Sequence, residues 1–85
     1  SDTLAIGAVQ ECHRRGWAVP GRIAIAGYGD MDLAAQLFPP LTTVKVNRYE
    51  MGRRAVRQLL ARLGGNAKVP TITSLGFEIV DRESA

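Results

Sequence analysis

The sequence predicts an α/β fold, a partial parallel-sheet sandwich in which helices cover the faces of a small sheet. Two observations lead to this prediction. Segments with helical spacing of apolar residues alternate with short strand-like segments along all 85 residues. Residues 23–26 are also continuously apolar, which is typical of a parallel strand covered on both faces. Such alternation places helices on a parallel sheet, so we expect one small α/β domain.

The first helix is predicted over residues 3–15 and the first strand over residues 22–27. Asp2 can accept the free amides of the first helical turn, and Gly16 suits the position just past the helix end. Gly27 and Gly29 end the strand, so the backbone there can turn sharply. The predicted core stripe of the helix consists of five residues at helical spacing: Leu4, Ala5, Ala8, Val9 and Cys12.

Three further elements and a final strand complete the order αβαβαβ. A short helix is predicted near 32–37, before the two prolines at 39–40, and the β-branched segment 42–46 predicts a strand. The longest helix is predicted over 49–63, with Gly64 just past its end. Segment 71–81 predicts the last strand, in which Gly76 marks a bulge or a bend. One side of the long helix is apolar: Gly52, Val56, Leu59, Leu60 and Leu63.

Composition excludes several classes of protein. The chain is 46% hydrophobic and 22% charged, which excludes a disordered tail, a collagenous chain and a disulfide scaffold. Its single cysteine excludes an intrachain disulfide and a multi-cysteine metal site. No apolar run approaches the roughly 20 residues that span a bilayer. The net charge of +3 permits nucleic-acid binding without arguing for it. Because the chain starts directly with a helix, we expect a fragment of a longer protein.

No catalytic centre is predicted. His13 reads as a surface histidine, and Cys12 as an inert core thiol. The pair Gly27 and Gly29 is too short for a nucleotide-binding fingerprint. Asp30 has another carboxylate two residues away, but no nucleophile, base or metal ligand accompanies them. We therefore expect no enzyme, no cofactor and no metal site.

Six blocks in order resemble the end of the core of lactose-repressor (LacI/GalR) family regulators. They cover nearly the whole chain, and the ordered set carries the resemblance more than any single block. The block at 39–44 is the most specific. The blocks are DTLAIGA at 2–8, RGWAVP at 15–20, IAIAGY at 23–28, PPLTTV at 39–44, EMGRRA at 50–55 and VDRES at 80–84.

The resemblance implies a larger bacterial transcription regulator. Family members carry an N-terminal helix-turn-helix headpiece, a hinge helix and a two-lobed periplasmic-binding-protein-like core. Residues 1–85 then correspond to a fragment of the C-terminal lobe, the effector-binding and dimerisation subdomain, and the headpiece is absent. Operator DNA would be contacted only by that headpiece, so the arginines between 48 and 62 read as a solvated helix face. The family implies a cytoplasmic protein that does not contact the membrane.

The resemblance also implies an effector site for a sugar or a sugar acid. The position of Gly29 often holds an aspartate that binds sugar hydroxyls, and glycine has no side chain to do so. This departure resembles members that respond to sugar acids such as gluconate, while a simple turn residue is an equal reading. Arg48 could meet a carboxylate or merely be exposed. The expected rim of the interlobe cleft consists of Ser1, Tyr28, Gly29, Asp30 and Arg48.

A homodimer is expected through the first and the short helix. Ile6 lies about 130° around the helix from the centre of the core stripe, on a side shared with Gln10. Leu33 and Leu37 are one turn apart on the short helix, and at least one is expected outside the core. By resemblance these four positions belong to the dimer interface of the C-terminal lobe.

Two alternatives stay open at this point. One is a periplasmic-type sugar-binding protein of the same fold, and the other is an enzyme with an α/β core. The blocks at 39–44 and 82–84 favour the regulator over the transport protein. The full-length gene would distinguish these two, because a regulator has a helix-turn-helix at its N-terminus and a transport protein has a signal peptide. An enzyme would need reactive side chains at the strand ends, where only one carboxylate is found.

Overall fold

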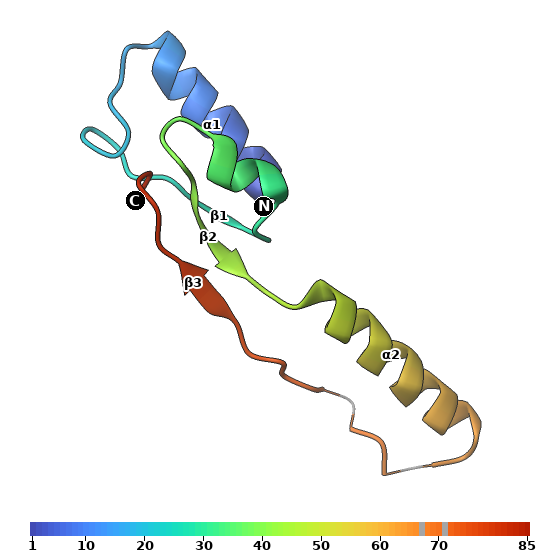
Figure 1. The fold of residues 1–85 in the computed structure, drawn as a ribbon. Coiled ribbons are helices and arrows are strands. Elements are labelled where there is room, and N and C mark those ends of the chain that lie inside the picture. The colour runs from blue at the N-terminus through green and yellow to red at the C-terminus, as the bar shows by residue number, and fades with distance from the viewer. Residues whose placement is uncertain (67, 71) are drawn as a thin grey trace. The chain divides into compact units, whose positions relative to one another are not determined.

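The computed structural model describes residues 1–66, 68–70 and 72–85 (Figure 1). The chain divides into two compact units. Unit 1 comprises Ser1–Lys45 and Phe77–Ala85, and unit 2 comprises Val46–Gly76. The chain passes between the units twice, at 45–46 and at 76–77.

Unit 1 contains two helices and three strands. They are α1 (Asp2–Arg14), β1 (Ala26–Tyr28), the 3₁₀ helix η1 (Asp32–Gln36), β2 (Thr42–Lys45) and β3 (Glu78–Val80). The predictions of the first helix, the short helix and the strand at 42–46 are confirmed to within a residue or two. Gly16, with φ +67, follows the end of α1 as predicted.

The sheet has the strand order β1-β2-β3 and is only partly parallel. β1 pairs with β2 in parallel, with Ala26 opposite Thr42. β3 pairs with β2 antiparallel, with Lys45 opposite Glu78, so the prediction of parallel strands is confirmed for β1 and β2 and wrong for β3. A parallel third strand needs a crossover that carries the chain back along the sheet. Here the chain leaves unit 1 after Lys45 and re-enters beside it, so β3 must run in the opposite direction.

Two strands are shorter than the sequence predicted. Residues 23–25 lie outside β1, and Ile23 is 42% exposed rather than covered on both faces. In the described part of unit 1, this segment forms no strand pairing. It contacts the C-terminal residues instead, where the Ile25 amide donates a hydrogen bond to the Ser84 carbonyl at 2.9 Å. Of the strand predicted at 71–81, only Glu78–Val80 pairs, because residues 72–76 belong to unit 2. Thr71 lies outside the described residues.

The core of unit 1 is small. It is built from Ala5, Ala34 and Leu41, with Ile25 and Leu37 packed against it. α1 faces this core through one narrow seam spaced three and four residues apart, formed by Asp2, Ala5, Val9 and Cys12. The predicted stripe was therefore too wide. Leu4 is 76% exposed and Ala8 is also exposed, because they flank this seam.

Unit 2 consists of α2 (Arg48–Leu63) and the segment that follows it. The predicted boundaries are confirmed. The Asn47 side chain caps the start by accepting from the Glu50 amide at 3.0 Å, and Gly64 caps the end. None of the helix's residues is buried, and the predicted apolar side is exposed, because the described part of unit 2 holds no sheet for it to cover.

Candidate functional site

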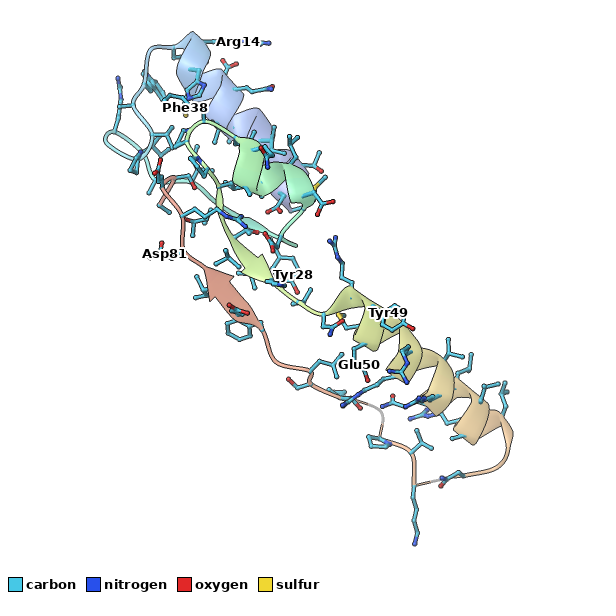
Figure 2. The ribbon with its side chains drawn as sticks, in the orientation of Figure 1. Arg14, Tyr28, Phe38, Tyr49, Glu50 and Asp81 are labelled. Carbon is cyan, nitrogen blue, oxygen red and sulfur yellow. The ribbon has the colours of Figure 1, made fainter. Side chains whose placement is uncertain are left out.

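The turn at 28–31 lies at the carboxyl end of β1, the end where open α/β sheets bind ligands. Three of the five predicted site residues, Tyr28, Gly29 and Asp30, are consecutive in this turn. Ser1 is the N-cap of α1, directly before Asp2, whose carboxylate reaches the turn. The Tyr28 side chain is 53% exposed (Figure 2), whereas Gly29 is buried. An exposed aromatic ring over a fixed backbone can stack on the apolar face of a ligand.

The backbone amides of residues 29–31 are all used within the protein. Consecutive N–H groups at 29–31 donate to acceptors on other elements: the Val44 carbonyl at 2.7 Å, Thr43 Oγ1 at 3.3 Å and Asp2 Oδ2 at 2.7 Å. A phosphate-binding loop needs such amides free to face the ligand. The turn therefore has the wrong geometry for a nucleotide phosphate, in agreement with the short glycine pattern.

The buried carboxylate of Asp2 supports the turn by accepting a hydrogen bond from the Met31 amide. Asp2 is fully buried, and its Oδ1 accepts a hydrogen bond from Thr43 Oγ1 at 2.6 Å. The backbone of Gly27 runs against this carboxylate, and a Cβ added there would overlap Asp2 Oδ1 and lie 3.0 Å from Leu41 Cδ2. Glycine is required at this position by the close approach.

The prediction that Asp2 caps the first helix is wrong, because the Ser1 side chain caps it by accepting from the Leu4 amide. Only the glycine at 27, at the end of a strand, indicated that a side chain approaches the backbone there.

Asp30 is held in an unusual conformation. Its φ is +50, in the left-handed region, and its side chain is 18% exposed. Arg82 Nη2 donates to Asp30 Oδ1 at 2.9 Å, and Nη1 of the same guanidinium donates to the Leu41 carbonyl at 2.9 Å. The negative charge of Asp30 is therefore paired within the protein. Arg82 was not among the predicted site residues, and its place in the block at 80–84 is the only sign of it in the sequence.

The other predicted residues belong to unit 2 or to the helices of unit 1 and their caps. Arg48 is the exposed first residue of α2 in unit 2, so its place at the rim stays a prediction. Of the predicted dimer residues, Gln10 is exposed and Leu33 is 49% exposed, while Ile6 is half-buried. Leu37 is half-buried against the core. At least one leucine of the short helix does lie outside the core, as predicted.

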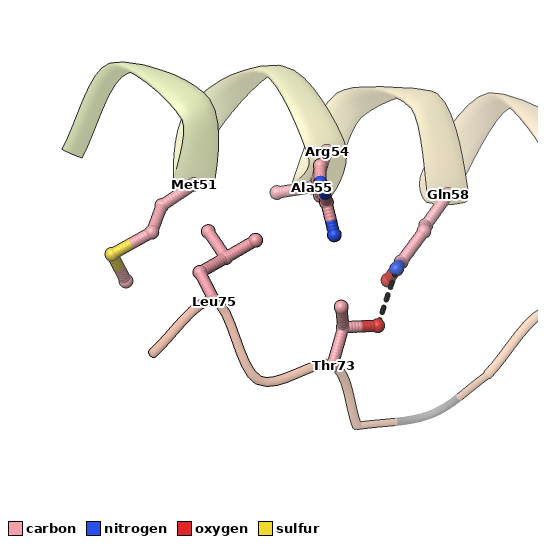
Figure 3. A pocket seen from close by; sticks show the side chains of 6 residues that line it. All are labelled: Met51, Arg54, Ala55, Gln58, Thr73 and Leu75. Atoms are coloured by element: carbon pink, nitrogen blue, oxygen red, sulfur yellow. Dashed lines mark hydrogen bonds between the residues drawn. The ribbon is translucent and has the colours of Figure 1, made fainter. Parts of the chain in front are cut away.

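A small pocket in unit 2 is a poor alternative site. It lies between α2 and the segment 73–75, where Gln58 Nε2 donates to Thr73 Oγ1 at 2.6 Å (Figure 3). Its volume of about 140 Å³ is below the roughly 300–1,000 Å³ of small-molecule sites. It contains none of the predicted site residues, since its lining consists of Met51, Arg54, Ala55, Gln58, Thr73 and Leu75.

Charged side chains on α2 pair locally. Glu50 contacts Arg53 at 3.0 Å and Arg54 at 3.2 Å, at the spacing of neighbours on a helix face. The hydrogen bond from Arg54 lowers the pKa of Glu50 from its ordinary value. Two of the arginines are thus engaged on their own helix. In the residues that the structure describes, no group of three His, Cys, Asp or Glu side chains could hold a metal ion, and no helix could cross a membrane.

The chain is similar to known proteins over its full length. Residues 1–85 match the model of the periplasmic binding protein-like domain. The chain is 43% identical to the HTH-type transcriptional regulator GalR of Streptococcus thermophilus, over 99% of this chain and 25% of that protein. The structure of transcription regulator GntR from Chromobacterium violaceum is 42% identical, with a TM-score of 0.80 over 99% of this chain and 31% of that one. A CelR–cellobiose complex is 32% identical, with a TM-score of 0.89 over 100% and 26%.

These matches confirm the resemblance to lactose-repressor-type regulators that the six blocks predicted, and they do not favour the periplasmic sugar-binding protein. The chain spans about a quarter of the length of the curated relatives it matches.

Proposed function

Because the chain belongs to the periplasmic binding protein-like domain family, we propose that it is the effector-binding and dimerisation part of a bacterial DNA-binding transcriptional regulator. One observation carries this proposal. The chain matches transcriptional regulators over 99% of its length, and it does so at 43% identity in the first of them. The turn at 28–31 supplies the exposed side chain of Tyr28 at the carboxyl end of β1, where open α/β sheets bind ligands.

The effector in this proposal is a sugar or a sugar acid. The CelR structure, similar over the whole of this chain, is a complex with cellobiose. The proposed rim of the site consists of Ser1, Tyr28, Gly29, Asp30 and Arg48. In this assignment Tyr28 stacks on the apolar face of the ring, and Arg48 meets a carboxylate where the effector has one.

Calorimetry on the full-length protein tests the effector class. The probes are gluconate as a sugar acid, and glucose and cellobiose as neutral sugars. Replacing Tyr28 with alanine should weaken binding about tenfold, equivalent to ~1.4 kcal/mol, because an aromatic contact is lost. Tyr49→Ala is the matched control, since Tyr49 is an exposed tyrosine of unit 2 outside the proposed rim. Unchanged affinity in Tyr28→Ala would remove this residue from the site.

The same chain is proposed to form a homodimer through Ile6, Gln10, Leu33 and Leu37. Ile6 and Gln10 lie one turn apart on α1, and Leu33 presents about half of its surface to solvent. A two-fold contact would bury this apolar surface against its own copy. Since Leu37 also packs on the core of unit 1, its contribution to the contact is its remaining exposed part.

Replacing Ile6 with glutamate tests the dimer. A charge in an apolar contact should dissociate the full-length dimer at low micromolar concentration, as measured by sedimentation velocity. Ala8→Glu is the control, because Ala8 is exposed about 200° around the same helix. Operator binding should weaken in the Ile6 variant only, since two headpieces must engage two half-sites together. An unchanged dimer would exclude this surface.

In this proposal operator DNA is contacted only by the part of the regulator outside residues 1–85. The protein is then a cytoplasmic, non-enzymatic switch that needs no cofactor and does not contact the membrane. A gel-shift assay with the full-length protein and its own promoter fragment tests this division of roles. Residues 1–85 alone should leave the fragment unshifted, while the full-length protein should shift it.

A further inference from the structure

We propose that Arg82 is a positioning residue for the turn at 28–31, and that it acts on the turn through Asp30. The inference rests on the proposed function only in taking this turn as part of the effector site. Arg82 lies just after β3 and is 52 residues from Asp30 along the chain, and no motif connects it to the turn.

The guanidinium of Arg82 bridges two parts of unit 1. Its Nη1 donates to the Leu41 carbonyl at 2.9 Å, and its Nη2 donates to Asp30 Oδ1 at 2.9 Å. The Arg82 backbone amide also donates to Thr42 Oγ1 at 2.9 Å. Arginine suits this task because its donors form a rigid planar fork, whereas lysine has a single ammonium group. The side chain is thereby anchored at the start of β2 while it holds the turn.

The turn needs such a hold because of the conformation of Asp30. A left-handed backbone is disfavoured for residues other than glycine, and aspartate is one of the few that tolerate it. The Asp30 amide is fixed by a long contact to Thr43 Oγ1 at 3.3 Å, which is weaker than the 2.7 Å bonds of its two neighbours. The ion pair lies where both side chains are less than a fifth exposed, so solvent screens it less than a surface pair.

The position of this turn matters because Gly29 has no side chain. A ligand at the turn would be contacted by Tyr28 and Asp30, whose places depend on the backbone on either side. Replacing Arg82 would free the turn without removing any residue of the proposed rim. Effector affinity would then fall through loss of preorganisation.

Hydrogen-exchange mass spectrometry of the full-length protein tests this proposal directly. In Arg82→Gln, a peptide covering 27–33 should exchange about tenfold faster, because a charged hydrogen bond that restrains the turn is lost. A peptide covering 5–12 of α1 should be unaffected. Asp30→Asn, which keeps the left-handed preference, should give the same acceleration, and Arg82→Lys should fall between. Arg14→Gln is the control, because the Arg14 side chain is 79% exposed on the same unit.

A double variant distinguishes a specific pair from general damage. Arg82→Gln combined with Asp30→Asn should exchange no faster than either single variant, since both remove one interaction. An unchanged peptide 27–33, an equal acceleration over α1, or additive effects in the double variant would each overturn the proposal. If Arg82→Gln fails to fold, Arg82→Lys and Asp30→Asn decide it by the same criteria.

Calorimetry with gluconate and cellobiose separates this inference from the proposed function. Where the wild-type protein binds a probe, Arg82→Gln should raise its Kd about tenfold, and Arg14→Gln should leave it within about twofold. Binding of neither probe by the wild-type protein would contradict the effector class, while the exchange result would still support or overturn the positioning role of Arg82.

Discussion

Replacing Gly27 with alanine tests the buried contact on which the turn is built. The new Cβ would overlap Asp2 Oδ1 and lie 3.0 Å from Leu41 Cδ2 and 3.1 Å from Asp2 Cγ. Neither neighbour can move away easily. Leu41 is fully buried, and the Asp2 carboxylate is fixed by Thr43 Oγ1 at 2.6 Å and the Met31 amide at 2.7 Å.

The cost of this substitution follows from two effects. Inserting one methyl group into a packed interior costs about 1–3 kcal/mol. Displacing the carboxylate weakens hydrogen bonds to a charged, buried group, each contributing about 1.5–3 kcal/mol. We expect Gly27→Ala to lower the free energy of unfolding by about 3–5 kcal/mol, a large part of the ~5–15 kcal/mol typical of a folded domain.

Urea unfolding of the full-length protein, followed by circular dichroism, measures this loss. Gly52→Ala is the matched control, because a Cβ at Gly52 meets nothing within 4 Å and alanine is the better helix former by about 1 kcal/mol. The same chemical change should therefore stabilise at one site and destabilise at the other. The double variant Asp2→Ala/Gly27→Ala should lose less stability than the sum of the singles. A Gly27→Ala protein within about 0.5 kcal/mol of wild type would refute the reasoning.

Three further outcomes are expected from the same structure. Ser84→Ala should cost about 1–3 kcal/mol in urea unfolding, because the buried hydroxyl donates to one carbonyl and accepts from one amide, while exposed Ser74→Ala should stay near wild type. The hydrogen bond from Arg54 lowers the pKa of Glu50, so the pairing that stabilises the helix is present above about pH 4.5 and is lost as the pH falls through the lowered pKa. An NMR titration of the Glu50 carboxyl should show the lowered pKa, and a pKa at its ordinary value would contradict the pairing. Cys12, which is buried, should react with a thiol reagent only after denaturation, and labelling of the native protein would contradict its placement.

Local chemistry accounts for the elements that the sequence predicted well. The helix at 49–63 is confirmed because its limits depend on neighbouring residues. Asn47 caps the amide of Glu50 three residues away, and Gly64 closes the last turn. The six blocks likewise identified the family, since they are contiguous segments whose order can be read directly.

The predictions of buried residues and of strand direction were less accurate, because both depend on what lies opposite an element in the folded chain. Leu4 fits the helical stripe of α1 by spacing, yet only the seam through Ala5 and Val9 meets the core. The prediction of parallel strands was wrong for β3 for the same reason. The direction of β3 follows from the path of the chain through unit 2, which periodicity does not contain.

The sequence by itself determined the order of helices and strands, the glycines that follow the helix ends, the family and the turn at the end of β1. Only the tertiary structure decided what holds that turn. The contacts that do so join Asp2 with Thr43, 41 residues apart, and Asp30 with Arg82, 52 residues apart. Helical periodicity and capping act over one to four residues, so they leave a signal in the local sequence. A contact between distant residues is not specified by local spacing, because it exists only when the whole unit has closed around its core.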